Sequence, residues 1–494
     1  MYNDQSWFLK RALLAPSRLA CVDIDSDQQW TYAQFARLIE QWVQRLTEEK
    51  LQQGDRVAIL AANHPELLAI LFACGLKGYI YVPLNFRLSH HELNDILEDC
   101  EPSILITDDL YENIALSFDG KKVMNREVPF NNEPCVFEMH SIQSVSADES
   151  WMMIYTGGTT GKPKGVLLSY HNVNWNALNT IVSWGLSERD CTVNYMPLFH
   201  TGGLNALSIP ILMAGGTVVI GHRFDAEQAL NEILKRKATI SLFVPTMYEL
   251  MTQSETFKKH DFPDVRVFLS GGAPCPVTVY EQFENKGLPF KEGYGLSEAG
   301  PNNFVIDVRV AKVKRGSVGK SMQFVDTLIV TKDHQPALIG EVGELWIRGR
   351  HVFRGYWRND KETAATMQNE WLKTGDLAKI DADGDTYIVG RKKDMIVTGG
   401  ENVYPQEIEH CLLLHRTIRE AAVIGLPDEK WGEVVTAFIS LSDPALFEET
   451  QLTEHCRQFL GGYKIPKKFV VLPELPKTHV GKIDKKQLSA LKVV

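Results

Sequence analysis

The sequence predicts an α/β protein with a large N-terminal domain of parallel sheets and a small C-terminal α+β domain. From residue 30 to about residue 300, short apolar runs without polar alternation alternate with helical segments, which is typical of parallel sheets covered on both faces. Beyond Gly316, short strands separated by turns predict an antiparallel or barrel-like region. A dense charge cluster at residues 390–394 marks a further change, so we predict domains at 1–390 and 391–494.

The N-terminal third is predicted to alternate strands and helices. Predicted strands cover residues 30–32, 56–60, 78–82 and 103–107, and predicted helices cover residues 32–48 and 64–77. The strand at 56–60 follows the turn Gly54-Asp55, and its continuous apolar side chains indicate burial on both faces. We therefore expect these strands to pair in parallel sheets.

Three further strands are predicted to run into glycine-rich turns. They lie in residues 193–203, 266–274 and 291–298. In open parallel sheets, ligands bind where strand ends meet such turns. The first of the three breaks at His200, which local evidence alone favours as an ordinary histidine at a strand end. Three such turns on one chain nevertheless favour a nucleotide site.

Residues 156–165 form a loop rich in glycine, threonine and lysine, entered from an apolar run of strand formers. Glycine permits the dihedrals with which successive amides converge on one point, and hydroxyls and ammonium groups add donors and charge. The loop is not a Walker A motif, because only three residues separate Gly157 from Gly161 and Pro163 follows Lys162. We predict that it holds a polyphosphate.

The C-terminal region differs from the rest in charge. From Arg391 onward 15 basic residues face 14 acidic ones, so residues 1–390 carry the acidic excess of the chain. Strands are predicted at 341–347 and 386–389 before this point, and a helix at 407–414 and a strand at 421–425 after it. These elements fit a small α+β module that follows a larger acidic domain.

Composition and charge exclude several classes of function. The 494-residue chain is 44% hydrophobic and 23% charged, as expected of a globular protein with two or three domains. Its formal net charge of −10 argues against a general nucleic-acid binder. Eight dispersed cysteines without a CxxC pair predict reduced thiols in a cytoplasmic protein and no structural zinc site. The first residues lack a signal-peptide pattern.

The longest uncharged run, residues 203–221, resembles a membrane span in composition alone. Pro210, Gly215 and Gly216 interrupt it, so we expect a buried helix followed by a strand at 217–220. No transmembrane segment is therefore predicted. Peripheral membrane contact and a homodimer are both left open.

Eight motifs occur in order along nearly the whole chain. They are YTGGTTGKPKG at 155–165, PLFH at 197–200, GGAP at 271–274, YGLSE at 294–298, WLKTGD at 371–376, GRKKD at 390–394, GGENVYP at 399–405 and GKI at 481–483. With this set the chain resembles the adenylate-forming superfamily, which contains acyl-CoA synthetases, luciferases and the adenylation domains of peptide synthetases. The resemblance implies a large N-terminal domain, a small mobile C-terminal domain and an active site between them.

The resemblance also implies how ATP and Mg²⁺ are bound. The loop over the β- and γ-phosphates would contain Thr156, Gly158, Thr159, Thr160, Gly161, Lys162 and Lys164. Adenine and the α-phosphate would be contacted by Gly272, Ala273, Pro274, Tyr294, Gly295 and Ser297. Asp376 would accept the ribose hydroxyls with help from Arg391, and Glu298 would be a ligand of Mg²⁺ or an acceptor in its second shell. Catalytic roles would fall to Lys482, His200, Thr156 and Glu298.

Lys482 is the residue that we expect to act in the first chemical step. An ammonium group between the carboxylate and the α-phosphate lowers the repulsion between two anions that must touch. By resemblance, Lys393 is the hinge about which the small domain rotates, exchanging Lys482 for the segment Gly399-Gly400. Such an exchange would complete the site in stages. Two residues depart from the family pattern: Gly157 replaces a Ser or Thr, and Ser297 replaces a Thr.

Among family members, the chain resembles acyl-CoA ligases most. Relatives that activate amino acids carry an Asp at the position of His200, and no carrier domain follows Lys482. We therefore predict an ATP-dependent, AMP-forming ligase that joins a fatty or aryl acid to coenzyme A through an acyl-adenylate. The acyl pocket, by resemblance, would be lined by Phe199, Val244, Met247, Ser270, Gly293 and Asn302. The alternatives are a luciferase-like oxidase and a non-catalytic adenylate-binding protein, which would be expected to have lost Lys482 or Glu298.

Overall fold

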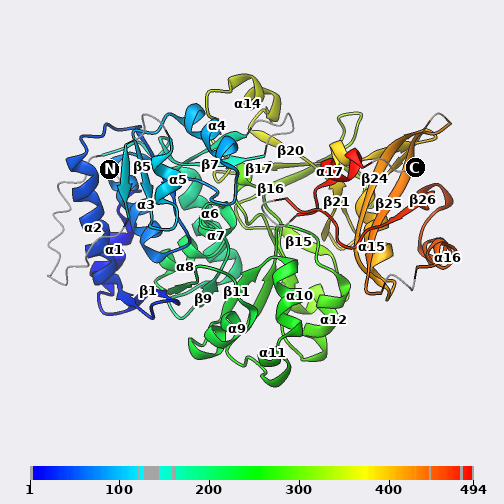
Figure 1. Cartoon of the computed structure of the whole chain (residues 1–494), viewed down its shortest axis with the longest axis horizontal. Helices are drawn as coiled ribbons and strands as arrows, with labels where there is room; N and C mark the ends of the chain where they lie inside the picture. Colours follow the sequence, from blue (N-terminus) through cyan, green and yellow to red (C-terminus); the bar gives the residue numbers. More distant parts are fainter. Residues whose placement is uncertain are drawn as a thin grey trace.

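The computed structural model describes residues 4–118, 122–126, 144–157, 163–428, 430–443, 447–478 and 482–491. In Figure 1 the N-terminal elements lie to the left, α9 to α12 lie at the bottom, and α15 to α17 gather with β24 to β26 at the right. The chain thus forms a large body and a smaller C-terminal one. This is the predicted fold class.

The first sheet contains the strands predicted at 56–60, 78–82 and 103–107. The strand predicted at 30–32 lies in another sheet and pairs antiparallel, so the expected parallel pairing is wrong for it. Its order is β18-β8-β7-β4-β3-β5-β6. The bounds are β3 (Arg56–Leu60), β4 (Ile80–Pro83), β5 (Ile104–Thr107), β6 (Val123–Asn125), β7 (Ser150–Thr156), β8 (Lys164–Ser169) and β18 (Gly355–Tyr356). Pairs from β7 through β6 are parallel, whereas β7–β8 and β8–β18 are antiparallel. The predicted parallel pairing is confirmed for β7, β4, β3, β5 and β6, and the described ends of the phosphate-loop motif lie on the antiparallel pair β7–β8.

Two smaller sheets follow, whose pairs are parallel except for the antiparallel pair β1–β2. One has the order β2-β1-β10-β9 and the other the order β11-β12-β13. The bounds are β1 (Leu19–Asp23), β2 (Gln29–Thr31), β9 (Cys191–Asn194), β10 (Thr217–Ile220), β11 (Ile240–Phe243), β12 (Val267–Ser270) and β13 (Phe290–Glu292). The third strand predicted at 291–298 is therefore short, and a loop and the 3₁₀ turn Ser297–Ala299 follow it. Strands β12 and β13 each end before a glycine-rich turn, as predicted. Strand β9 ends at Asn194, and Gly202 and Gly203 lie in helix α7 (Thr201–Leu204), so the predicted strand that continues to His200 is wrong.

The helices have recognisable start and stop signals. Those of the large body are α1 (Trp7–Leu14), α2 (Tyr32–Glu48), α3 (Pro65–Lys77), α4 (His90–Cys100), α5 (Glu112–Leu116), α6 (Tyr170–Trp184), α7 (Thr201–Leu204), α8 (Ser208–Ala214), α9 (Ala226–Lys235), α10 (Pro245–Gln253), α11 (Glu255–Lys259), α12 (Val277–Asn285), α13 (Val308–Val313) and α14 (Asp360–Thr366). Helix α3 begins with Pro65 and ends at Gly78, whose φ of 74° is left-handed. The next strand consequently begins at Ile80, two residues later than predicted.

The uncharged run 203–221 is divided between a helix and a strand. Helix α8 is capped by Gly215 in the left-handed region, and β10 follows as predicted. No helix in the described ranges is long and apolar enough to cross a membrane.

An antiparallel sheet connects the two bodies. Its order is β14-β15-β21-β20-β17-β16, with β19 beside β20. The bounds are β14 (Phe304–Val305), β15 (Ser317–Ser321), β16 (Asp326–Val330), β17 (Gly343–Arg348), β19 (Met367–Gln368), β20 (Trp371–Ile380) and β21 (Thr386–Arg391). The antiparallel region predicted beyond Gly316 is thus present. It places Asp376 and Arg391 opposite each other in the β20–β21 register.

The C-terminal elements form their own sheet and core. The strands are β22 (Ile396–Thr398), β23 (Glu401–Val403), β24 (Ile418–Asp428), β25 (Gly432–Leu441) and β26 (Lys468–Val471), and the helices are α15 (Pro405–Leu413), α16 (Glu449–Phe459) and α17 (Lys485–Ala490). A separate apolar cluster that starts at Ile396 packs between them. Strand β21 ends at Arg391 and a 3₁₀ turn, Lys392–Asp394, follows. This order supports a division at residue 390/391, which stays a prediction.

Candidate active site

The described ends of the predicted phosphate loop lie on β7 and β8, which pair as antiparallel strands. Thr156 is the last residue of β7 and pairs in register with Lys164, the first residue of β8. Gly157 is exposed, and a Cβ added to it would meet none of the described residues within 4 Å. The members of the loop that lie outside the described residues are Gly158, Thr159, Thr160, Gly161 and Lys162.

Lys164 is largely buried and already engaged. Its ammonium group pairs with Glu362 in α14 and lies 5.3 Å from the centre of the Tyr356 ring. Its side chain keeps only 13% of its exposure. The structure therefore holds this cation at the base of the loop through two residues that the motif analysis did not identify.

Glu298 lies on the 3₁₀ turn that follows β13. Its Oε1 accepts a 2.8 Å hydrogen bond from the Tyr356 hydroxyl, and its carbonyl oxygen accepts from the amide of Phe353. Within the described ranges no group donates to Oε2. Mg²⁺ prefers hard oxygen ligands, and a half-buried carboxylate with one oxygen that accepts no hydrogen bond can supply one. Glu298 would hold Mg²⁺ there, and the ion would neutralise phosphate charge.

The turn that carries Glu298 requires a glycine at its start. A Cβ at Gly295 would lie 2.2 Å from the backbone of Pro301, a distance that no side chain tolerates. Ser297, the next predicted site residue, is buried at 5% exposure. The tight turn thus sets Ser297 and Glu298 at the end of β13.

The predicted adenine loop follows β12. Gly272 has a φ of 85°, in the left-handed region that favours glycine, and Ala273 and Pro274 are exposed. Beneath the loop, the amide of Cys275 donates to Glu292 Oε2 at 3.0 Å. Sequence reasoning missed Glu292, because a single acid at a strand end carries no local signal.

Asp376 is the best-defined of the predicted nucleotide residues. It is 5% exposed, its Oδ2 accepts a 2.6 Å hydrogen bond from Tyr294, and its Oδ1 lies 3.0 Å from Nε of Arg391. Burial would lower the pKa of Arg391, but the charge of Asp376 raises it. Tyr294, Asp376 and Arg391, which belong to three different motifs, thus meet. Each oxygen of the Asp376 carboxylate has a hydrogen-bonding or charged partner, and the two hydroxyls of a ribose could take the place of these partners.

His200 lies at the start of α7, where its Nδ1 faces the amide of Gly202 at 3.5 Å. Burial, with the nearby charge of Lys482, lowers the pKa of His200 to about 4. The chain folds tightly here, because a Cβ at Gly203 would lie 2.2 Å from the carbonyl oxygen of Pro197. The imidazole is therefore neutral at physiological pH and firmly placed.

Lys482 comes from the C-terminal body. Its backbone is tied to Thr478, whose amide donates to the Lys482 carbonyl at 2.6 Å and whose hydroxyl accepts from the Lys482 amide at 3.3 Å. The Lys482 side chain retains access to solvent, yet it lies within electrostatic reach of His200, Asp376 and Arg391. Burial by the surrounding protein and the charge of Arg391 lower the pKa of Lys482, and Asp376 partly offsets them.

The second set of C-terminal residues lies elsewhere. Gly399 and Gly400 form the β22–β23 turn, with φ of 59° and 85°, and the amide of Gly399 donates to the carbonyl of Trp431. Both glycines are exposed. Lys393 lies in the exposed 3₁₀ turn after β21. The structure thus brings Lys482, rather than the Gly399-Gly400 turn, to His200.

The residues predicted for the acyl pocket have different surroundings. Phe199 contacts Phe86 edge-on at 5.2 Å between ring centres, and the Arg87 guanidinium lies 5.6 to 5.9 Å from these two rings. Asn302, in contrast, is 3% exposed and donates to Thr180 and to the carbonyl of Ala206. Asn302 therefore serves the packing behind the site. The remaining predicted lining residues are Val244, Met247, Ser270 and Gly293.

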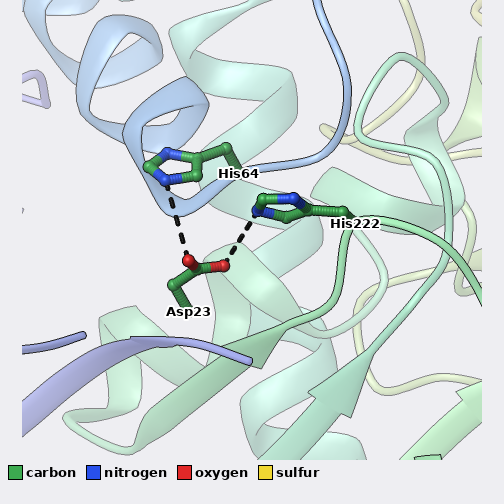
Figure 2. A group of neighbouring side chains, drawn as sticks. All are labelled: Asp23, His64 and His222. Carbon is green, nitrogen blue, oxygen red and sulfur yellow. Dashed lines mark ion pairs between the residues drawn. The ribbon is translucent and has the colours of Figure 1, made fainter. Parts of the chain in front are cut away.

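A second polar cluster joins β1, α3 and the segment after β10. Figure 2 shows His64 and His222 pointing at the two oxygens of Asp23, with Nε2–oxygen distances of 3.9 and 3.0 Å. Three such groups could suggest a metal site. Nδ1 of His64, however, already accepts from the amide of Glu66 and lies 2.9 Å from Arg126, so the proton of the ring is on Nε2. That proton points to Asp23, so Nε2 of His64 has no lone pair to offer a metal ion. The three side chains therefore form a charge cluster rather than a set of three metal ligands.

Two family models match the chain. The AMP-binding enzyme model matches residues 8–357, and the AMP-binding enzyme C-terminal domain model matches residues 407–482. The chain belongs to the AMP-binding enzyme family. This AMP-binding enzyme is similar over nearly its whole length to curated relatives that act on aromatic acids.

The feruloyl-CoA synthase of an Amycolatopsis species is 35% identical over 481 residues, which cover 97% of each chain. The 2-succinylbenzoate–CoA ligase of Bacillus subtilis is 34% identical over 494 residues, covering 99% of this chain and 98% of the relative. The solved o-succinylbenzoate CoA synthetase of Bacillus subtilis, in complex with its acyl-adenylate intermediate, aligns with a TM-score of 0.88 at 32% identity. The alignment covers 99% of this chain and 98% of the solved chain. This AMP-binding enzyme is an ATP-dependent, AMP-forming acid–CoA ligase that uses Mg²⁺.

Proposed function

We propose that this ligase activates an aryl-containing carboxylic acid, and that Lys482 and His200 act at the carboxylate. The observation that carries the proposal is the position of Lys482. Its charge contributes to the lowered pKa of His200, and its own pKa is affected by the charges of Arg391 and Asp376. We infer from this that a single ammonium group acts between the expected acid and the expected ribose. That is where the carboxylate and the α-phosphate must meet.

In the first step, a carboxylate oxygen attacks the α-phosphorus of ATP and pyrophosphate leaves. Lys482 would offset the repulsion of the two anions, and Glu298 would hold Mg²⁺ against the phosphates. Lys164 and Thr156, at the base of the hairpin, would stabilise the departing pyrophosphate. His200, which is neutral, would offer a hydrogen bond to the acid without adding a second positive charge.

In the second step, the thiol of coenzyme A attacks the acyl carbon and AMP leaves. We propose that the small domain turns about Lys393 to bring Gly399 and Gly400 to the site in place of Lys482. The exposed positions of Lys393 and of the Gly399-Gly400 turn support this exchange. None of these three exposed residues is held in a buried contact that the rotation would have to break.

The aryl specificity rests on the relatives and on the side chains beside His200. The curated relatives are named for feruloyl, indoleacetate and 2-succinylbenzoate substrates, each of which carries a ring. In this chain Phe199, the residue before His200, packs edge-on against Phe86. Aromatic edges and faces of this kind favour a planar ring as a partner. An aryl acid is therefore proposed ahead of a fatty acid.

A panel of acids tests this proposal. Hydroxycinnamic, indoleacetic, benzoic and medium- and long-chain fatty acids would each be assayed for AMP release with ATP, Mg²⁺ and coenzyme A. The expected result is acid-dependent AMP release that is fastest with an aryl acid. A preference for fatty acids would overturn the aryl assignment, and no AMP with any acid would overturn the assigned roles.

We also propose a division of the chain into domains at 1–390 and 391–494, and a cytoplasmic location. The separate C-terminal core supports the first, and the seven described cysteines, all free and buried, agree with the second. A homodimer is a further proposal, to be tested by sedimentation.

A further inference from the structure

Tyr356 touches two groups of the proposed adenylate-forming site at once. It lies in β18, a two-residue strand that pairs with β8 behind the phosphate hairpin, and it is 8% exposed. Its hydroxyl donates to Glu298 Oε1 at 2.8 Å, and its ring centre lies 5.3 Å from the Lys164 ammonium group. One buried side chain thus contacts both a carboxylate and a cation that we assign to Mg²⁺ and phosphate.

The position of Tyr356 is held from several directions. Its amide donates to the hydroxyl of Thr363 in α14 at 2.9 Å, and its ring packs on Phe353 with 5.0 Å between centres. The amide of the next residue, Trp357, donates to the carbonyl of Gly165 at 2.8 Å. Because the backbone is fixed on both sides of it, the hydroxyl and the ring have little freedom to move.

The chemistry of the two contacts differs in a useful way. Lys164 has an ion-pair partner in Glu362, whereas the partner of Glu298 is a neutral hydroxyl. A neutral donor orients a carboxylate and leaves its negative charge available for a cation. An Arg or Lys partner would instead neutralise the charge of the carboxylate. The hydrogen bond at Oε1 also leaves Oε2 without a donor among the described residues.

We propose that Tyr356 is a positioning residue for the adenylate-forming step. Its hydroxyl orients Glu298 toward Mg²⁺, and its ring supports Lys164 at the base of the phosphate loop. This inference rests on the proposed roles of Glu298 and Lys164. It adds a residue that lies in none of the eight sequence motifs.

The Tyr356→Phe variant tests the hydroxyl while it keeps the ring and its packing. Loss of an outer partner of a metal-binding carboxylate lowers metal affinity or activity by about 10–100-fold. We expect calorimetric titration of ATP at increasing Mg²⁺ to show a Mg²⁺ requirement higher by that factor, with ATP binding in EDTA unchanged. Pyrophosphate exchange should fall to a similar extent, and thioester formation from supplied acyl-adenylate should be retained.

Tyr195→Phe is the matched control, because the Tyr195 hydroxyl also donates to a side chain, Gln228, at 2.9 Å but lies outside the site. A Tyr356→Phe variant that binds ATP and Mg²⁺ like Tyr195→Phe would overturn the proposal. So would equal losses in both chemical steps.

A double-mutant cycle with Glu298→Gln separates a local role from general destabilisation. If Tyr356 acts through Glu298, Tyr356→Phe should produce little further loss of Mg²⁺-dependent binding in the Glu298→Gln background. Additive losses would contradict the inference. Since the calorimetry needs no acid, failure of the acid panel and failure of this proposal are distinguishable.

Discussion

Single residues in this enzyme owe their charge state to their neighbours. The pKa of His64 is lowered to about 3, first by burial and then by the charge of Arg126. For Asp23, burial would raise the pKa, but hydrogen bonds from His222 and Ser26 lower it to about 2. His222, between Asp23 and Asp25, has a raised pKa although burial opposes the shift. The cluster therefore contains a neutral histidine, His64, and a second histidine whose pKa the two carboxylates raise.

This charge state predicts a pH dependence of stability at His64. Its folded pKa of about 3 lies below the unfolded value, so between these values only the unfolded chain binds the proton. Lowering the pH from 7 to 5 should therefore reduce the free energy of unfolding by up to about 2 kcal/mol through this residue. His64→Asn should flatten that dependence, because Asn still caps α3 but does not titrate.

Denaturant unfolding of wild type and His64→Asn at several pH values measures the difference. His260→Asn, at an exposed histidine, serves as the control. If the free energy of unfolding changed with pH by the same slope in all three proteins, His64 would be protonated in the folded state and the prediction would be wrong.

At the scale of elements, the β7–β8 hairpin decides what the phosphate loop can do. Two antiparallel strands hold Thr156 and Lys164 opposite each other, and β18 buttresses β8 from the other side. The loop between them therefore has fixed ends. Its one departure from the family pattern, Gly157, lies at the first position beyond β7.

A Gly157→Ser substitution should restore a hydroxyl to the loop without strain. No described residue lies within 4 Å of the new Cβ, and the backbone needs no left-handed φ. One added hydrogen bond to phosphate should lower KM for ATP or speed the first step by about two- to tenfold, as a net gain of about 0.5–1.5 kcal/mol implies. Initial rates of pyrophosphate exchange measure this. Gly462→Ser, with equally open space, is the control; no change at Gly157 would mean that another donor supplies the contact.

At the scale of the whole molecule, the site exists only because two bodies meet. The large body supplies His200 and Asp376, and the small body supplies Lys482. We propose that this arrangement serves the first step and that the small body turns for the second step, since the Gly399-Gly400 turn is exposed here.

This division of labour predicts that Lys482→Ala separates the two steps. Pyrophosphate exchange should fall by about 10²- to 10³-fold, the cost of removing one group that stabilises developing charge. Thioester formation from supplied acyl-adenylate should be largely intact, because Lys482 has then left the site. Lys486→Ala, at an exposed lysine of the same tail, is the control. Equal losses in both steps would contradict the exchange of domains.

The sequence by itself determined the elements and the order of the chemistry. Continuous apolar runs such as Arg56–Leu60 became buried parallel strands, and Pro65 and Gly78 set the ends of α3, since burial pattern and backbone propensity are local properties. The eight motifs indicated the family for the same reason. What they could not indicate was which side chains would meet.

Only the tertiary structure decided the partners. Lys164 pairs with Glu362, 198 residues away, and Tyr356 with Glu298, 58 residues away, although neither Glu362 nor Tyr356 belongs to a motif. Asp23, His64 and His222 likewise meet from three separate segments (Figure 2). Such contacts depend on how strands are ordered in a sheet and on how two bodies dock. Those are non-local choices, and no window of the sequence encodes them.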